Sequence, residues 1–155
     1  MLTIKEQTIV YEIGLSIEFF TVEDVTNWAD SYILNTEMPD YQIIELSLLG
    51  SKGRKELLHR LSSITSKMDI TIPAKTLLGL LYKSYSNKIY SVKDIAKKLY
   101  QLSTHIFYVN ISESLKYELN AIEDTLDFYG EEKTATLIQD LLKDFLIYAE
   151  NFTSL

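Results

Sequence analysis

The sequence predicts an all-α protein: a single irregular multi-helix bundle of about eight helices, folded as one domain over residues 1–155. Helix breakers are scarce, because the 155 residues include only two prolines and five glycines. Apolar residues recur at steps of three and four along most of the chain, which is the helical period. A composition of 46% hydrophobic and 24% charged residues is typical of a chain that buries one core.

The first two helices are expected over residues 3–17 and 21–35. Thr21 and Asp24 have the spacing of a capping box, in which the hydroxyl and the carboxylate each accept a backbone N–H at the start of a helix. The earlier helix is less distinct, because the β-branched residues between Thr8 and Ile13 would also suit a strand.

Pro39 and Gly50 bound the third expected helix. Proline suits the first turn, where its missing N–H would have no partner, and glycine suits a left-handed exit. The segment between them is apolar nearly all round, so the sequence predicts that this helix is the central, buried one. The residues behind this prediction are Ile43, Ile44, Leu46, Leu48 and Leu49. The fourth helix follows Gly53, with apolar residues at helical steps from Leu57 to Ile64.

Four further helices complete the predicted bundle. They are expected to start at Pro73, at the capping residue Ser91, at a cap formed by Asn110 with Glu113, and at about residue 132. Gly130 is expected to end the seventh helix, and the eighth runs to about residue 151.

Two short segments, residues 70–72 and 106–111, are rich enough in β-branched and aromatic residues to form strands instead. No internal repeat with a fixed period is evident in the sequence. The pattern therefore favours an irregular bundle over a solenoid.

Charge is distributed in three blocks. Residues 1–50 carry nine acids and one base, residues 51–110 carry eleven bases and three acids, and residues 111–155 carry ten acids and three bases. The net charge is −7, which argues against nucleic acid as a direct ligand, because phosphate binding requires an excess of lysine and arginine. An acidic surface instead favours a basic protein as the partner.

Common catalytic and metal-binding patterns are missing. The absence of cysteine excludes disulfides and thiolate sites, and His59 and His105 do not have the spacing of metal ligands. Glu123, Asp124 and Asp127 have some likeness to the acidic magnesium motif of prenyl-transferring enzymes, but a second copy of that motif is missing. The sequence therefore predicts a protein without enzymatic activity or cofactor, with a carboxylate-bound metal as the enzymatic alternative.

The N-terminal residues interrupt their apolar positions with Glu6, Glu12 and Glu18, which a secretory signal would not do. No apolar run approaches the roughly 20 residues that span a bilayer. We therefore expect a cytoplasmic protein without a membrane partner. Three of the eleven tyrosines, Tyr32, Tyr41 and Tyr129, lie near acids and are candidates for a binding face, with ordinary packing as the alternative.

A family resemblance extends over roughly residues 20–85. It is carried by Trp28-Ala29-Asp30, Pro39, the segment from Ile43 to Leu48, Leu57-Leu58 and Leu61. This pattern resembles the helical immunity proteins of bacterial polymorphic-toxin and contact-dependent growth inhibition systems. The resemblance implies a cytoplasmic protein that binds and neutralises one cognate toxin domain, often a nuclease. Nucleases present basic clefts, so the acidic charge points the same way.

Two acidic groups are the candidates for contacting such a toxin. The alternative function is a regulatory helical adaptor that binds partner helices in an apolar groove. The candidate residues are Glu23, Asp24, Asp30, Glu37 and Asp40 in the first group, and Glu123, Asp124, Asp127, Glu131 and Glu132 in the second.

Overall fold

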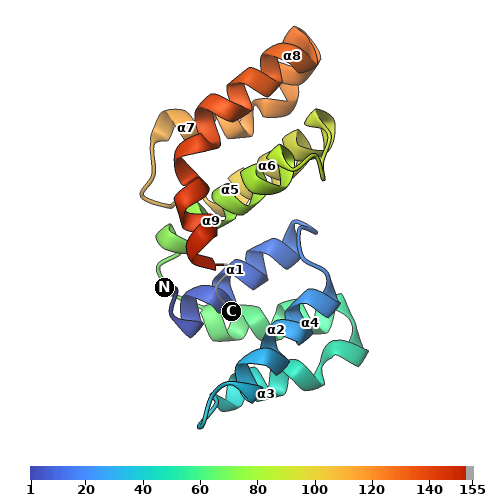
Figure 1. Cartoon of the computed structure of the whole chain (residues 1–155), viewed down its shortest axis with the longest axis vertical. Helices are drawn as coiled ribbons and strands as arrows, with labels where there is room; N and C mark the ends of the chain where they lie inside the picture. The colour runs from blue at the N-terminus through green and yellow to red at the C-terminus, as the bar shows by residue number, and fades with distance from the viewer. Residues whose placement is uncertain (153–155) are drawn as a thin grey trace. The chain divides into compact units, whose positions relative to one another are not determined.

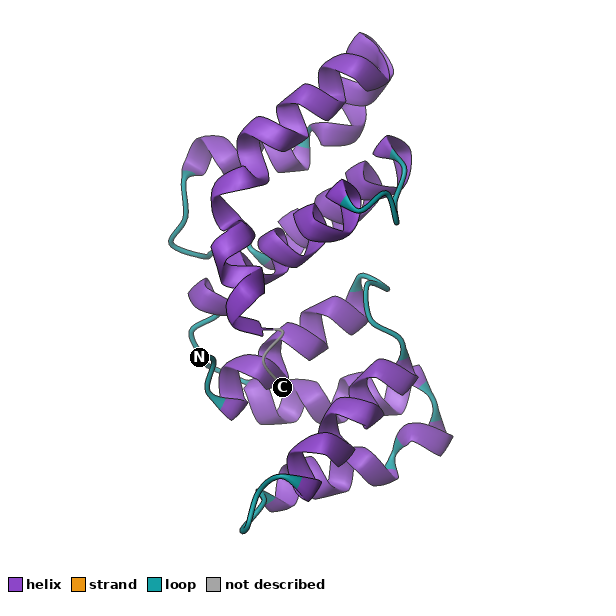
Figure 2. Ribbon diagram, viewed as in Figure 1, coloured by secondary structure: helices purple, strands orange, loops and turns teal. Residues whose placement is uncertain are grey.

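The computed structural model describes residues 1–152 and confirms the predicted all-α class (Figure 1). Within this range the chain forms helices joined by loops, and no strand is present (Figure 2). The α-helices are α1 (Ile4–Ser16), α2 (Val22–Leu34), α3 (Tyr41–Leu48), α4 (Arg54–Thr65), α5 (Thr71–Ser86), α6 (Val92–His105), α7 (Glu113–Asn120), α8 (Ile122–Leu142) and α9 (Leu146–Phe152). Two short 3₁₀ helices, η1 (Gly50–Lys52) and η2 (Lys143–Phe145), connect them.

The chain divides into two compact units. The N-terminal unit, residues 3–68, contains α1 to α4, and the C-terminal unit contains α5 to α9 together with Met1 and Leu2. The expectation of one domain over residues 1–155 stays a prediction, and each unit is described by itself.

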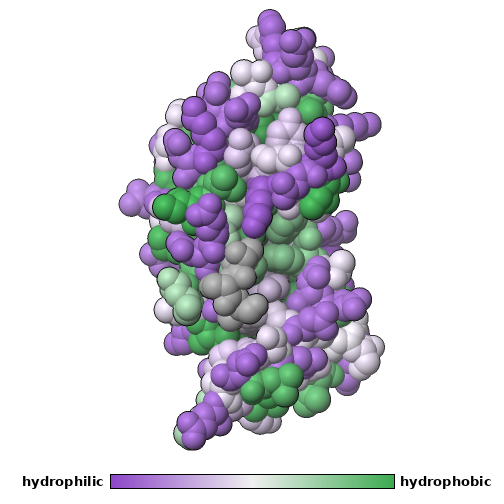
Figure 3. All heavy atoms as spheres, viewed as in Figure 1, coloured by the Kyte–Doolittle hydropathy of each residue, from purple (hydrophilic) through white to green (hydrophobic). Residues whose placement is uncertain are grey.

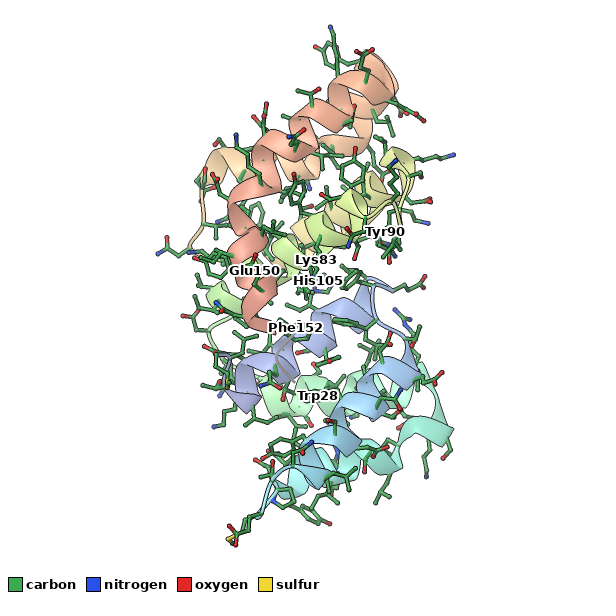
Figure 4. The ribbon with its side chains drawn as sticks, viewed as in Figure 1. Trp28, Lys83, Tyr90, His105, Glu150 and Phe152 are labelled. Carbon is green, nitrogen blue, oxygen red and sulfur yellow. The ribbon has the colours of Figure 1, made fainter. Side chains whose placement is uncertain are left out.

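Trp28 of α2 is the centre of the N-terminal unit (Figure 4). Its indole is 4% exposed, its Nε1 donates a hydrogen bond of 3.0 Å to the Oε1 atom of Gln7, and its ring stacks on Tyr11 at 4.5 Å between centroids. Burial, with a smaller contribution from nearby Asp24, raises the pKa of the Tyr11 phenol to about 12. The surrounding apolar side chains come from all four helices: Leu15, Val25, Ala29, Ile43, Leu46, Leu57 and Leu61.

The C-terminal unit is organised around α5, which packs against α9, while α6 packs against α7 and α8. Leu77, Leu78 and Leu81 of α5 are fully buried, as are Leu99 and Leu102 of α6. The apolar steps seen in the sequence therefore mark the buried faces of these two helices.

The expectation that the third helix would be central and buried is wrong. Only Ile43 and Leu46 of α3 are buried, and Leu48 is 72% exposed. Eight residues make little more than two helical turns, so α3 presents one face to α2 and leaves its other apolar residues at the surface. Pro39 precedes the N-cap residue Asp40 instead of lying in the first turn, and Gly50 opens η1 instead of taking a left-handed conformation.

The region after α6 is more broken than the sequence predicted. Ser112, not Asn110, caps α7, and a single residue, Ala121, separates the end of α7 at Asn120 from the start of α8. Gly130 does interrupt the helix as predicted: with φ 84° and ψ 176° it divides α8 into residues 122–129 and 131–142. The last predicted helix is interrupted by η2, so its final part is the separate helix α9.

The two units share one order of elements, although the sequence has no internal repeat with a fixed period. In each unit a first helix ends in a turn with a left-handed residue, Glu18 (φ 59°) or Lys88 (φ 60°), and a capped second helix follows. An eight-residue third helix comes next, and then a glycine with ψ 176°, Gly53 or Gly130, opens a helical stretch of 12 residues. In the C-terminal unit η2 and α9 follow this stretch.

The spacing explains why the repeat is hidden. Glu18 and Lys88 are 70 positions apart, whereas Gly53 and Gly130 are 77 apart. The C-terminal unit inserts a longer segment, residues 122–129, where the N-terminal unit has only the three residues of η1. A single fixed period therefore aligns either the first two helices of the two units or the 12-residue stretches that follow Gly53 and Gly130, but not both.

Glu12 of α1 provides a test of packing within the N-terminal unit. Its carboxylate accepts hydrogen bonds from Thr65 and Ser62 of α4. Burial nevertheless raises the pKa of Glu12 above its ordinary value, because the two hydrogen bonds offset only part of the desolvation.

We expect Glu12→Gln to raise the melting temperature near pH 7 and to change it much less near about pH 4. A raised pKa means that the folded chain binds the proton more tightly than the unfolded chain. The contribution to stability is therefore largest when Glu12 is protonated, and it is lost as pH rises from the unfolded pKa through the folded one. Thermal melts followed by circular dichroism check this, with Glu56→Gln on the exposed side of α4 as the control. Equal gains at both pH values would contradict the assignment.

Candidate protein-binding surface

The first acidic group lies in the N-terminal unit, and all five of its residues are exposed. Two of them also stabilise the start of a helix by accepting backbone hydrogen bonds. Asp24 completes a capping box with Thr21, whose N–H donates to the Asp24 carboxylate at 2.8 Å. Asp40 caps α3 by accepting a hydrogen bond of 2.9 Å from the backbone N–H of Gln42. Replacing either carboxylate would disturb a helix as well as any binding surface.

The structure does not gather the first group into one patch. Glu23 and Asp24 lie in the first turn of α2, whereas Glu37 and Asp40 lie in the connection beyond its last turn. A helix of 13 residues is about 20 Å long at ~1.5 Å per residue. Asp30 lies between the two ends, about two turns from Glu23 and on the same side of α2.

The second acidic group is compact. All five carboxylates of this group are exposed and lie within ten residues of α8, on both sides of Gly130. We call residues 123–132 the α8 elbow. On the face shown in Figure 3, mostly hydrophilic residues cover α8, with hydrophobic residues between them.

Two aromatic side chains project from the same segment. Phe128 is 84% exposed and Tyr129 is 64% exposed. The Nζ atom of Lys133 lies 5.4 Å from the Tyr129 ring centroid, so this ring already has an intramolecular cation beside it. Phe128 is therefore the apolar side chain of the α8 elbow most available to a partner, and protein interfaces commonly place such an anchor inside a polar rim.

Lysines from residues 51–110, the basic middle block of the sequence, face one side of the elbow. Lys93 and Lys97 of α6 line a groove of about 540 Å³ together with Glu123, Asp127 and Glu131. Within residues 1–152 neither lysine makes an ion pair with these carboxylates at 4.0 Å or less. The lysines therefore lower the negative charge on the α6 side of the elbow without closing salt bridges.

The basic block does not form a unit of its own. Five of its eleven bases belong to residues 51–68 in the N-terminal unit, and six belong to residues 69–110 in the C-terminal unit. As a result, residues 3–68 carry ten acids and six bases, and residues 69–155 carry twelve acids and nine bases. Each unit is net acidic, although neither is uniformly so.

A second groove in the C-terminal unit is lined by tyrosines that the sequence analysis did not select. It has a volume of about 660 Å³ and lies between the end of α5, the following turn, and residues 132–139 of α8. Tyr82, Tyr85 and Tyr90 line it, with Glu132 and Lys88 among the charged residues. Burial and the neighbouring Tyr82 raise the pKa of Tyr85. Figure 4 shows Tyr90 at the turn between α5 and α6.

The tyrosines selected from the sequence have different surroundings. Tyr32 is half-buried, and its hydroxyl oxygen accepts a hydrogen bond of 3.3 Å from the backbone N–H of Asp40. Tyr41 and Tyr129 are exposed. Proximity to acids in the sequence thus identified two exposed tyrosines and one half-buried tyrosine. The meeting of three other tyrosines at one groove depends on how α5, α6 and α8 pack.

No group of three or more histidine, cysteine, aspartate or glutamate side chains suited to hold a metal ion occurs within the described range, residues 1–152. His59 and His105 are exposed and lie on different units. The segment from Glu123 to Asp127 thus presents an acidic face without an arranged ligand set.

Comparison with known proteins finds no match to this chain among protein-family models, curated proteins or solved structures. Among the helices of residues 1–152, none combines the length and the apolar character needed to cross a bilayer.

Proposed function

We propose that this chain is a bacterial, cytoplasmic immunity protein that neutralises a cognate toxin domain, a nuclease, through the α8 elbow. It acts by binding, without a cofactor or a reaction of its own. The observation that carries the proposal is the density of exposed groups at the elbow: residues 123–132 present five exposed carboxylates and the exposed Phe128. The class of toxin follows from the family resemblance.

The two kinds of side chain support different parts of binding. Carboxylates of the elbow attract a basic cleft over a distance and raise the association rate, and they occupy the place of substrate phosphates once bound. Phe128 loses most of its exposed apolar surface when a partner covers it, which slows dissociation. A nuclease blocked in this way loses access to its substrate without any chemical change.

The elbow carboxylates are testable with Asp124→Lys combined with Asp127→Lys. We expect the association rate with the basic toxin domain encoded by the adjacent gene to fall by at least about tenfold at low salt, with a weaker salt dependence. The matched control is Glu23→Lys with Asp30→Lys, which changes the charge equally on α2 of the N-terminal unit and should have a smaller effect. Surface plasmon resonance at several salt concentrations measures both.

Phe128→Ala should instead raise the dissociation rate by about tenfold, equivalent to ~1.4 kcal/mol, with little change in association. Failure of the wild-type chain to bind or inhibit the adjacent toxin domain would refute the proposed function. Equal effects of the α8 and α2 charge reversals would refute the assignment of the interface to the elbow.

The alternative function, a regulatory adaptor that binds partner helices through an apolar groove, predicts a different salt response. Apolar burial is hardly screened by salt, so the affinity would be nearly constant between low and high salt. The salt series described for the elbow variants therefore separates the two functions.

A further inference from the structure

The two units differ where the 12-residue helical stretch that follows Gly53 or Gly130 begins. In the N-terminal unit Arg54 directly follows Gly53 and reaches the end of α1. Its Nη2 donates to the carbonyl oxygens of Leu15 at 3.2 Å and Ser16 at 2.9 Å, and its Nε donates to Leu15 at 3.3 Å. The C-terminal end of a helix carries partial negative charge, so a guanidinium is well suited to this place.

The C-terminal unit has no such arginine. The residue that follows Gly130 is Glu131, and a carboxylate has no hydrogen to donate to helix carbonyls. Glu131 instead lines the groove beside Lys93 and Lys97.

The counterparts of Leu15 and Ser16, 70 positions further on, are Tyr85 and Ser86 at the end of α5. Both line the groove of about 660 Å³ with Tyr82, Tyr90 and Glu132. An arginine thus binds the end of the first helix in the N-terminal unit, whereas the end of α5 borders a groove whose lining includes no arginine.

We propose that this groove, the tyrosine groove, receives an arginine side chain of the partner protein, in the place that Arg54 occupies in the N-terminal unit. The proposal rests on the proposed function, because it assumes a basic protein partner, and it names a side chain by which that partner is held. A guanidinium is planar and offers five donors, so it can stack on the ring of Tyr82 or Tyr85 while it pairs with Glu132. The Tyr90 ring already has an intramolecular cation beside it, because the Nζ atom of Lys98 lies 5.3 Å from its centroid.

One residue of the groove opposes a cation. Lys88 also lines the groove, and its ammonium repels a bound guanidinium. Replacement of Lys88 by glutamine should therefore strengthen binding of an arginine, whereas it would weaken binding of an anion. The sign of this effect distinguishes a cation site from an anion site.

The test uses capped arginine, N-acetyl-arginine amide, titrated into the ¹⁵N-labelled full chain and followed by two-dimensional NMR. Its matched control is capped citrulline, which has nearly the same shape but no charge. We expect saturable shifts at the amides of Tyr85, Ser86 and Tyr90 with arginine, and at least about fivefold weaker binding with citrulline. No saturable shifts up to about 50 mM arginine, or equal binding of citrulline, would overturn the proposal.

Glu131→Arg gives the C-terminal unit an arginine directly after its glycine, as Arg54 follows Gly53. Lys93 and Lys97 should repel the new guanidinium from the groove beside α6 and favour its contact with the end of α5. We expect it to weaken capped-arginine binding by at least about tenfold, whereas Glu118→Arg, the same charge change on exposed α7, should leave binding within about twofold. Glu132→Gln removes the carboxylate that pairs with the guanidinium, adds no bulk, and should also weaken capped-arginine binding. This second variant tests the groove even if the Glu131→Arg chain does not fold. Binding by Glu131→Arg as strong as that of the wild type, in a folded chain, would overturn the equivalence with Arg54.

The result is independent of the test of the proposed function. Capped arginine reports on the tyrosine groove without any partner protein, and Asp124 and Asp127 of the elbow do not line that groove. If the toxin domain binds but capped arginine does not, the groove assignment fails alone. If capped arginine binds but no basic partner is found, the proposed function fails alone.

Discussion

Gly79→Ala is expected to destabilise the C-terminal unit by at least about 3 kcal/mol, near the upper end of the range for overpacking a core. Gly79 lies on the face of α5 that packs against η2 and α9. A Cβ atom at this position would lie 2.2 Å from the carbonyl oxygen of Phe145 and 3.1 Å from the backbone nitrogen of Ala149. Backbone atoms cannot rotate away as a side chain can, so α9 would have to move off α5.

The measurement is hydrogen exchange of the α9 amides together with urea unfolding followed by circular dichroism. We expect the amides of α9 to exchange faster, while the amides of α2 keep the exchange rates of the wild type. This result would show that the destabilisation is confined to the helix that contacts Gly79. Ser84→Ala, on the same helix and half-buried, is the control and should change stability by less than about 0.5 kcal/mol. A Gly79→Ala chain as stable as the wild type would contradict the close approach of α5 and α9.

Gly14→Ala provides a graded comparison in the N-terminal unit. A Cβ atom there would lie 2.2 Å from the Cδ2 atom of Phe20, which belongs to a side-chain ring. Because a ring can turn at the cost of some packing, we expect a smaller loss than at Gly79.

Trp28→Ala is expected to cost the N-terminal unit about 3–5 kcal/mol, the usual range for removing a buried aromatic side chain. The substitution removes the stacking on Tyr11 and leaves the Oε1 atom of Gln7 without its indole donor. Trp28→Phe keeps most of the volume and isolates the hydrogen bond, so its cost should be about 1–3 kcal/mol.

Urea unfolding by circular dichroism measures both variants, and Phe128→Ala is the matched control. Phe128 is an exposed aromatic residue, so its truncation should change stability by less than about 0.5 kcal/mol. Trp28 is the only tryptophan of the chain, so wild-type indole fluorescence reports on the N-terminal unit by itself. A cost for Trp28→Ala as small as that for Phe128→Ala would contradict a core built around the indole.

The parts of the fold that local chemistry fixes could be predicted from the sequence. The capping box at Thr21 and the interruption at Gly130 were both predicted and are both present. These features depend on hydrogen bonds and backbone conformations within a few residues, so they are readable from sequence spacing. The central place assigned to α3 was wrong, because apolar composition does not say how many neighbours a short helix has.

The candidate binding surface likewise has parts that could be predicted from the sequence and parts that could not. The sequence identified all five carboxylates of the α8 elbow, because charged side chains on a helix are exposed unless they are paired. It gave the first acidic group equal weight, although α2 separates the members of that group and two of them cap helices. It also did not select Tyr82, Tyr85 and Tyr90, which meet only when the helices pack.

By itself the sequence determined the helical class, most helix starts and the acidic character of the surface, because each follows from spacing and composition. Only the tertiary structure decided that both units follow one order of helices with unequal spacing. It also decided that Arg54 binds the end of α1 in one unit, whereas a groove without arginine borders the end of α5 in the other. The physical reason is that a hydrogen bond across 38 residues, such as that from Arg54 to Ser16, depends on the path of the whole chain between them and leaves no trace in local sequence.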